Sequence, residues 1–245
     1  MLSRSTVRAI LPLFVALGSL VGTATAQVEF EPVRALPFPF SPAYFVAPAD
    51  WDGDGDIDVI GASSGVAVAM NDGGGGFTPG AGRAFGWSAS AMAVADFDGD
   101  GTLDVALHRQ EAVVTVVLGD GSGGFGAEIS TPVFDVGYRA DPVLAGDFDS
   151  DGASDLLVFI SSRLYLNRFD GAGALVARLV YQDPTAWDVT VGDWNEDGRL
   201  DFVTSLIIVR GFHLVLGDGA GGFAPPSPRF QPVRVLPSGC DVGRE

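Results

Sequence analysis

Four acidic loops with one shared pattern recur along the chain. Each carries an oxygen-bearing side chain at positions 1, 3, 5 and 9 and a glycine at position 6, and they begin at Asp50, Asp96, Asp147 and Asp193. Like charges held this close repel one another strongly unless a cation lies among them. Hard oxygen ligands in this number suit Ca²⁺, which takes 6–8 oxygens at about 2.3–2.6 Å. The pattern therefore predicts calcium sites, about four in all.

The predicted ligands are the side chains at positions 1, 3, 5 and 9 together with the residue at position 7, which offers its backbone carbonyl. In chain order they are Asp50, Asp52, Asp54, Asp56 and Asp58; Asp96, Asp98, Asp100, Thr102 and Asp104; Asp147, Asp149, Asp151, Ala153 and Asp155; and Asp193, Asn195, Asp197, Arg199 and Asp201. Ordinary Asp- and Gly-rich turns are the alternative. Spacings of 46, 51 and 46 residues between the copies disfavour that alternative.

The four loops are not expected to bind calcium equally. In the third loop Ser154 replaces the apolar residue at position 8, which weakens the attachment of the loop to the core. In the fourth loop the neutral Asn195 at position 3 lowers the ligand charge. We therefore expect the first two loops to bind calcium most tightly.

Short apolar runs flank every loop and predict strands before and after it. A third run follows, then a turn of the form Asp-Gly-x-Gly that begins at Asp72, Asp120, Asp170 and Asp218, and then a fourth run. Glycines there permit the positive φ of a hairpin turn, and the absence of a helix pattern after them excludes a nucleotide-binding loop. Four antiparallel strands in about 48 residues predict an all-β fold of propeller blades. The repeats are expected at about 43–85, 89–133, 141–181 and 187–231.

The paired loop and glycine motifs resemble the FG-GAP/VCBS repeat family, which occurs in integrin α-subunit propellers and in secreted bacterial proteins. The resemblance covers residues 43–231 and implies a β-propeller-like array of four four-stranded, calcium-binding blades. An EF-hand is excluded because Gly61, Leu107, Val158 and Thr204 stand where its loop needs Glu. Family propellers resemble closed rings of about seven blades. Four repeats therefore imply either a ring closed by the strand expected at Val28–Leu36, or an incomplete propeller that another chain completes.

The first 26 residues have the pattern of a secretory signal peptide. Arg4 and Arg8 precede the apolar run Ala9–Gly22, and the small residues Ala24–Ala26 resemble a cleavage site. Uncleaved anchoring is the alternative. We therefore predict a mature domain over residues 27–245 that is secreted to the extracellular space, the periplasm or the cell surface. Because Cys240 is the only cysteine, packing and metal rather than an internal disulfide are expected to stabilise it.

Composition and motifs argue against nucleic-acid binding and against catalysis. The net charge is −17, and more than half of the acidic residues lie in the four loops. The two histidines form neither a zinc spacing nor a nucleophile motif. His108 is expected at the turn between the second and third strands of its repeat, and His213 early in a third strand. The carboxylates could imitate a glycosidase pair, but their spacing favours ligands. The prediction is a protein that is not an enzyme.

A ligand-binding face is expected at the end of the blades opposite the calcium loops. The connections there collect arginines and aromatic residues, which are enriched in interfaces: Trp87, Arg109, Tyr138, Arg139, Arg163, Trp187 and Arg210. Packing between blades is the alternative for each aromatic residue. The main hypothesis is a secreted, calcium-binding adhesion or ligand-binding module for an extracellular protein or polysaccharide, with self-association to complete the propeller. The alternative is a non-catalytic part of a larger extracellular enzyme, a polysaccharide-active hydrolase or lyase.

Overall fold

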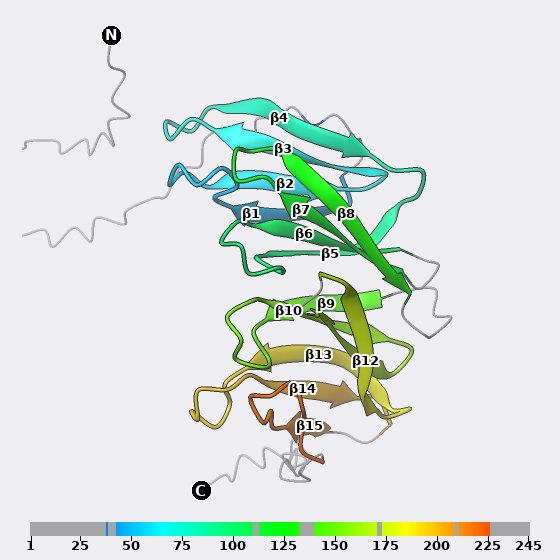
Figure 1. Ribbon diagram of the computed structural model, residues 1–245. Helices are drawn as coiled ribbons and strands as arrows, with labels where there is room; N and C mark the ends of the chain where they lie inside the picture. Colours follow the sequence, from blue (N-terminus) through cyan, green and yellow to red (C-terminus); the bar gives the residue numbers. More distant parts are fainter. Residues whose placement is uncertain are drawn as a thin grey trace, which may run out of the picture. The chain divides into compact units, whose positions relative to one another are not determined.

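The structure is a computed structural model that describes residues 38, 43–109, 113–132, 140–170, 173–208 and 211–225 (Figure 1). The chain divides into two units, residues 1–35 and 36–245, and all described residues belong to the second. They contain fifteen β-strands and no helix, which confirms the predicted all-β fold. Accordingly, this part of the chain has no helix that could cross a membrane. The predictions for residues 1–26, Val28–Leu36, Tyr138, Arg139, Arg210 and Cys240 lie outside the described residues.

The strands form four antiparallel sheets, each built from strands that are consecutive in the chain. The first contains β1 (Phe45–Ala49), β2 (Asp58–Ala62), β3 (Gly65–Asn71) and β4 (Phe77–Ala84). The second contains β5 (Ala89–Ala95), β6 (Asp104–Arg109), β7 (Val113–Gly119) and β8 (Phe125–Pro132). The third contains β9 (Ala140–Gly146), β10 (Asp155–Ile160), β11 (Arg163–Phe169) and β12 (Leu175–Gln182). The fourth contains β13 (Ala186–Gly192), β14 (Asp201–Leu206) and β15 (Gly211–Val215), and Phe223 adds an isolated bridge to Gly217 where a fourth strand is expected.

The two central strands of each sheet explain the continuous apolar runs of the sequence. All six residues of β10 are buried, so this strand is covered on both faces. Side chains alternate between the faces of a strand, and Leu156 accordingly packs toward the second sheet while Leu157 packs toward the fourth. The outer strands β4, β8 and β12 consist mostly of exposed and half-buried residues instead, with Leu175 and Tyr181 of β12 buried.

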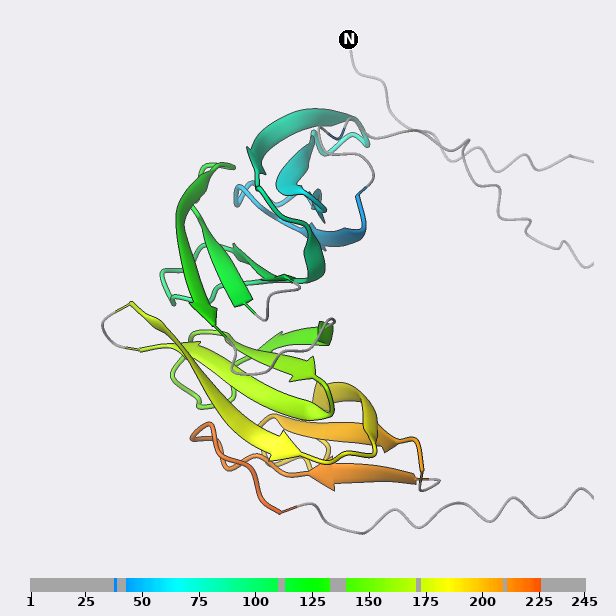
Figure 2. The same ribbon diagram turned by 90° about the vertical axis from the view of Figure 1, so that its right-hand side faces the viewer.

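Three apolar clusters hold the sheets together, and each lies between consecutive sheets. Ile60 and Val105 share the first cluster, Ala106 and Leu156 the second, and Leu157 and Phe202 the third. The extensive contacts between strands of different sheets likewise join consecutive sheets. Within the described ranges the four sheets therefore form an open array and not a closed ring (Figure 2).

Candidate metal-binding loops

Each acidic loop connects the first strand of a sheet to the second, and hydrogen bonds within the loop fix its course. The position-1 carboxylate accepts the backbone N–H of the position-6 glycine, at 3.0 Å for Asp50 and 2.9 Å for Asp96. The position-5 carboxylate accepts the N–H of position 7, at 2.7 Å for Asp100. Gly101, at position 6, has a φ of 90°, a left-handed conformation that side chains other than glycine rarely adopt. The same bonds recur in all four loops, so the loops share one local geometry.

The position-9 aspartate is buried and ties the loop to the third strand. One oxygen of Asp104 accepts the N–H of Phe97 at 2.8 Å, and the other accepts the N–H of Gly119 at 2.9 Å. Equivalent pairs of bonds form at Asp58 and at Asp201. Because a buried N–H without a partner is costly, this carboxylate stabilises the junction of loop and sheet. The sequence indicated a ligand at this position but not this second role.

In the first three loops the carboxylates at positions 1, 3 and 9 converge. One oxygen from each lies within 4.8 Å of the others, and the triplets are Asp50, Asp52 and Asp58; Asp96, Asp98 and Asp104; and Asp147, Asp149 and Asp155. Such a group of oxygens could hold a metal ion. The position-5 carboxylates lie outside these triplets. In the fourth loop the amide of Asn195 takes the place of the position-3 carboxylate, and it bonds to Asp197 at 3.0 Å.

The electrostatics of the triplets fit a cation. Burial raises the pKa of Asp104 to about 6 and that of Asp155 to about 7, although backbone N–H groups that donate to each carboxylate lower it. The Oδ1 atoms of Asp50 and Asp149 are buried and accept no hydrogen bond from the described residues. Buried oxygens without partners are uncommon in folded proteins. A divalent cation would coordinate them and offset the cost of burying negative charge.

The third and fourth loops differ from the first two in backbone strain. Position 4 adopts a left-handed conformation in every loop, with a φ of 73° at Gly53 and 75° at Gly99. Ser150 and Glu196 stand at the same position with a φ of 61° each. For a residue with a side chain this conformation costs roughly 1–2 kcal/mol. Forming the loop is thus more costly in the third and fourth copies, in line with the expected ranking of affinities.

An arginine competes for the third site. The guanidinium of Arg168 in β11 forms an ion pair with the position-3 carboxylate of Asp149. Calcium binding at this loop must therefore share or displace a positive charge that is already in place. We expect Arg168→Ala to raise the calcium affinity of the third loop several-fold, because one unit of competing charge a few ångströms away is removed. Calorimetric calcium titration of the two proteins measures this, and an unchanged or weaker affinity would contradict it.

The structure describes four of the seven residues predicted for the ligand face, and it brings two of them together. The Arg109 guanidinium lies 5.4 Å from the centre of the Trp87 ring. Phe85 stacks on the same ring with centroids 4.6 Å apart, and Trp87 packs against the cluster between the first and second sheets. Trp187 is instead 68% exposed. Arg163 begins β11 and is half-buried. Trp87 therefore packs between two sheets, whereas the ring of Trp187 is mostly exposed to solvent.

The expectation for His108 was wrong. It lies inside β6 and is fully buried, because β6 continues to Arg109 and pairs with strands on both sides. Its Nδ1 lies 2.8 Å from the hydroxyl of Ser90 in the neighbouring strand β5. His213 lies in β15 as predicted, and its Nδ1 is 2.9 Å from the Tyr181 hydroxyl.

Repeated four-stranded sheets with an acidic loop after the first strand define a class of β-repeat protein. The comparison with family models agrees with this class. The family model of the FG-GAP-like repeat matches residues 50–107 and 96–158, which span the first two sheets and part of the third. This match supports the resemblance to FG-GAP-like repeats that the motifs predict. None of the curated proteins searched matches the chain.

Solved structures show a similar fold. A lectin of Agrocybe aegerita, described as specific for non-reducing terminal N-acetylglucosamine, is 26% identical over 74% of this chain with a TM-score of 0.58. The match covers 50% of the lectin chain, so this chain spans about half of its length. Two further structures are less similar. The Photorhabdus luminescens Tc holotoxin pore is 16% identical over 80% of this chain and 10% of that chain, with a TM-score of 0.41. BBS1N in complex with ARL6DN is 12% identical over 77% of this chain and 56% of that chain, with a TM-score of 0.49.

Proposed function

We propose that the protein is a calcium-stabilised, non-catalytic module that binds carbohydrate outside the cell. The observation that carries the calcium part is the set of three carboxylate triplets, two of which contain a buried oxygen with no hydrogen bond. Position 1, 3 and 9 side chains hold the ion in this proposal, and the fourth loop binds it more weakly. The ion supplies positive charge that rigidifies the loops, and no chemical step depends on it.

The carbohydrate part is supported by the likeness to the lectin and by one exposed aromatic residue. Sugar rings present C–H groups that pack on an open aromatic face, and Trp187 has such a face. The FG-GAP-like repeats support an extracellular location, and the signal-peptide pattern of residues 1–26 agrees with it. Polysaccharides and the glycans of glycoproteins both present such sugar rings, so either could be the ligand. The alternative to both is a protein ligand that is recognised without any sugar.

Two tryptophan variants test the ligand site. We expect Trp187→Ala to weaken glycan binding about thirtyfold or more and to leave the melting temperature unchanged, because the ring is exposed. Trp87→Ala should instead destabilise the fold by about 2 kcal/mol, since its ring packs on the core, and the folded fraction should keep its affinity.

The measurement is calorimetric titration with N-acetylglucosamine-terminated oligosaccharides and with an acidic polysaccharide, alongside thermal melts. Trp187→Phe serves as the conservative control and should retain most of the affinity. If the wild-type protein binds no glycan but binds a deglycosylated matrix protein, the carbohydrate proposal is wrong.

A further inference from the structure

Each of the first three sheets contacts the next through the same four positions. They are the loop aromatic at position 2, the residue two after the position-9 aspartate, and two residues of the third strand. The three sets are Trp51, Ile60, Val66 and Val68; Phe97, Ala106, Val114 and Val116; and Phe148, Leu157, Leu164 and Leu166. All twelve side chains are at most 3% exposed. We call these four positions the stacking face of a sheet.

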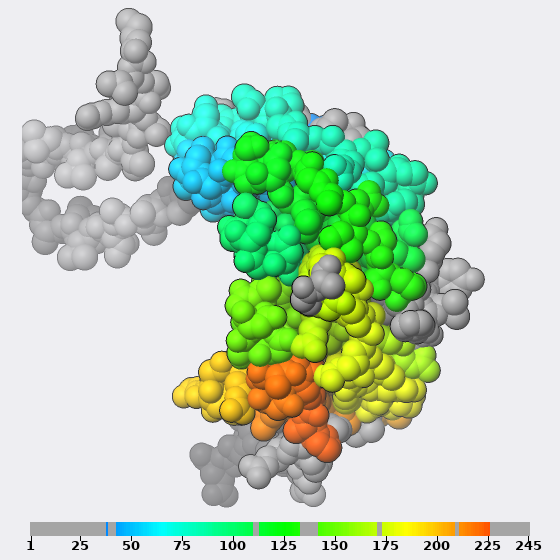
Figure 3. Space-filling view, viewed as in Figure 1, coloured from blue at the N-terminus to red at the C-terminus, as the bar shows by residue number. Residues whose placement is uncertain are grey.

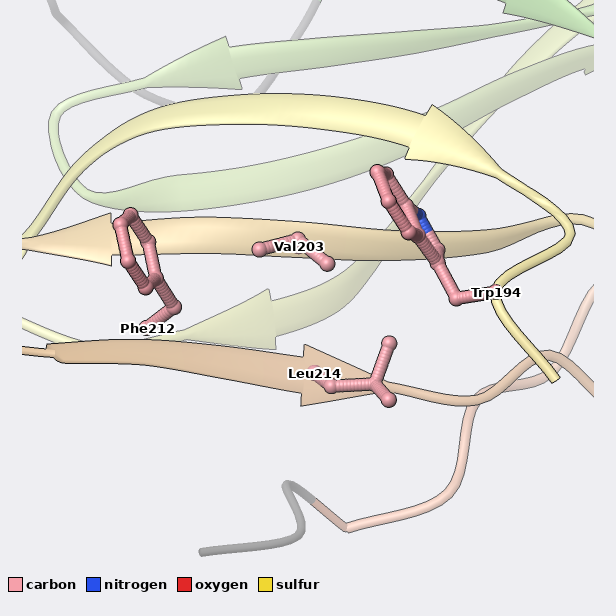
Figure 4. A pocket seen from close by; sticks show the side chains of 4 residues that line it. All are labelled: Trp194, Val203, Phe212 and Leu214. Atoms are coloured by element: carbon pink, nitrogen blue, oxygen red, sulfur yellow. The ribbon is translucent and has the colours of Figure 1, made fainter. Parts of the chain in front are cut away.

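On the fourth sheet the stacking face is open. The equivalent residues, Trp194, Val203, Phe212 and Leu214, line a hollow of about 240 Å³, and Figure 4 shows Val203 between the two aromatic rings. Trp194 is 52% exposed and Phe212 54% exposed. The register matches that of the third sheet, because Val203 lies opposite Leu214 as Leu157 lies opposite Leu166. The described residues thus bury this apolar surface on three sheets and leave it exposed on the fourth.

The edges of the open stacking face are acidic. A second hollow of about 140 Å³ shares two residues with the first, and the exposed Asp188 of β13 lines it. The acidic loop that carries Trp194, gold in Figure 3, also exposes Asp193 and Asp197. A segment that fits this face should therefore combine apolar side chains with positive charge.

Residues 226–240 of the same chain have this composition. They contain four large apolar side chains, two arginines and no acidic residue: Phe230, Val233, Val235, Leu236, Arg229 and Arg234. The chain as a whole has a net charge of −17, so a stretch with only positive charge is an exception within it. Its apolar side chains match the hollow, and its arginines match the carboxylates at the edges.

The segment also starts beside the face. The N–H of Ala224 donates to the carbonyl of Leu216 at 2.8 Å, and Leu216 lies two residues after Leu214 of the hollow. Residue 226 therefore follows within two residues of the edge of the fourth sheet. A segment tethered this closely has an effective concentration on the order of millimolar, which gives it an advantage over a free second copy of the chain.

The preceding repeats return to the stacking face after a similar length of chain. From the residue that follows the glycine turn, the first strand of the next sheet begins 11 to 15 residues later: Phe77 to Ala89, Phe125 to Ala140, and Leu175 to Ala186. Each of these first strands contributes to the cluster on the preceding stacking face. The same interval counted from Phe223 ends at residues 234–238, which lie inside the segment 226–240.

We propose that residues 226–240 fold back over the open stacking face of the fourth sheet. Phe230, the largest of the apolar side chains, fills the hollow, and Arg229 and Arg234 lie beside the acidic edges. The segment does for the fourth sheet what the next sheet does for each of the first three, because it keeps an apolar surface away from water. This inference rests on the fold and the sequence and is independent of the proposed glycan binding.

Trypsin tests the contact, because it cleaves after arginine and cuts only a segment that is free to enter its active site. The bond after Arg229 should be cut slowly in the wild-type protein. Val203→Glu places a charge in the hollow and should speed this cleavage at least about tenfold. Val176→Glu, at a 46% exposed position of β12 outside the face, is the control and should be cut at the wild-type rate. Mass spectrometry follows the cleavage, and thermal melts establish that each variant is folded.

Two truncations test the same contact without a charge in the hollow. Removal of residues 226–245 should expose the stacking face and raise the fluorescence of anilinonaphthalene sulfonate, a dye that binds apolar surface, at least about threefold. Removal of residues 241–245 alone is the matched control and should leave the dye fluorescence unchanged. Light scattering gives the mass of each protein in solution.

Three results would overturn the proposal. The first is a bond after Arg229 that trypsin cuts as fast in the wild-type protein as in Val203→Glu. The second is a dye fluorescence that the longer truncation leaves unchanged. The third is a wild-type protein with the mass of two chains in which this bond is cut at once, because a second copy then covers the face. If Val203→Glu does not fold, the two truncations decide.

Discussion

Chelation of calcium with EDTA is expected to lower the melting temperature of the protein by roughly 10–20 °C. For a site with a Kd on the order of 0.1 mM and about 1 mM Ca²⁺, mass action gives roughly 1.4 kcal/mol per site. Three or four sites then contribute about 4–6 kcal/mol, a large part of the roughly 5–15 kcal/mol that stabilises a typical domain. The effect is large because the loops sit at every junction between the first and second strands.

The experiment is a thermal melt followed by far-ultraviolet circular dichroism in calcium, in EDTA, and in EDTA after calcium is restored. Added Mg²⁺ is the control ion, since its demand for short octahedral bonds fits an irregular carboxylate loop poorly. Calcium should restore the original melting temperature and Mg²⁺ should not. A melting temperature that is indifferent to EDTA would show that the triplets are hydrogen-bonded turns rather than metal sites.

The fold could be predicted from the sequence because its signals are local and repeated. The Asp and Gly pattern of each loop dictates its hydrogen bonds, as the position-1 carboxylate of Asp96 and the N–H of Gly101 show. Apolar runs between such loops are long enough for strands and too short for helices. Four repetitions of the pattern made the family resemblance specific, and the match at residues 50–158 agrees with it.

What the sequence could not predict depends on neighbours in space. Trp51 and Trp194 hold the same position of the same motif, yet Trp51 is 3% exposed and Trp194 is 52% exposed. The difference arises because a second sheet covers the first loop, whereas no described residue stacks in the same way on the fourth. The ion pair of Arg168 with Asp149 likewise joins residues of different strands, and no local motif encodes it. Loop chemistry is local, but exposure and charge pairing are not.

The aspartates of one loop should fall into two classes of effect when they are removed. Asp104→Ala leaves the N–H groups of the buried Phe97 and the half-buried Gly119 without their acceptor, and a buried donor without a partner costs about 1–3 kcal/mol. We therefore expect a loss of about 2–4 kcal/mol in the free energy of unfolding, after some relief from removing a buried carboxylate. Asp98→Ala removes an exposed ligand of the same triplet and should cost only the calcium contribution of one site, about 1.4 kcal/mol.

Urea unfolding of both variants, in calcium and in EDTA, separates the two roles. In EDTA the loss for Asp98→Ala should nearly vanish, because its carboxylate then has no ion to bind. The loss for Asp104→Ala should largely remain, because the two backbone donors lose their acceptor whether or not an ion is bound. Asp100→Ala, at the exposed position 5, is the matched control and should resemble Asp98→Ala or be milder. If all three variants lose stability in calcium and none does in EDTA, Asp104 is a ligand alone, and the junction of loop and sheet is held by packing instead.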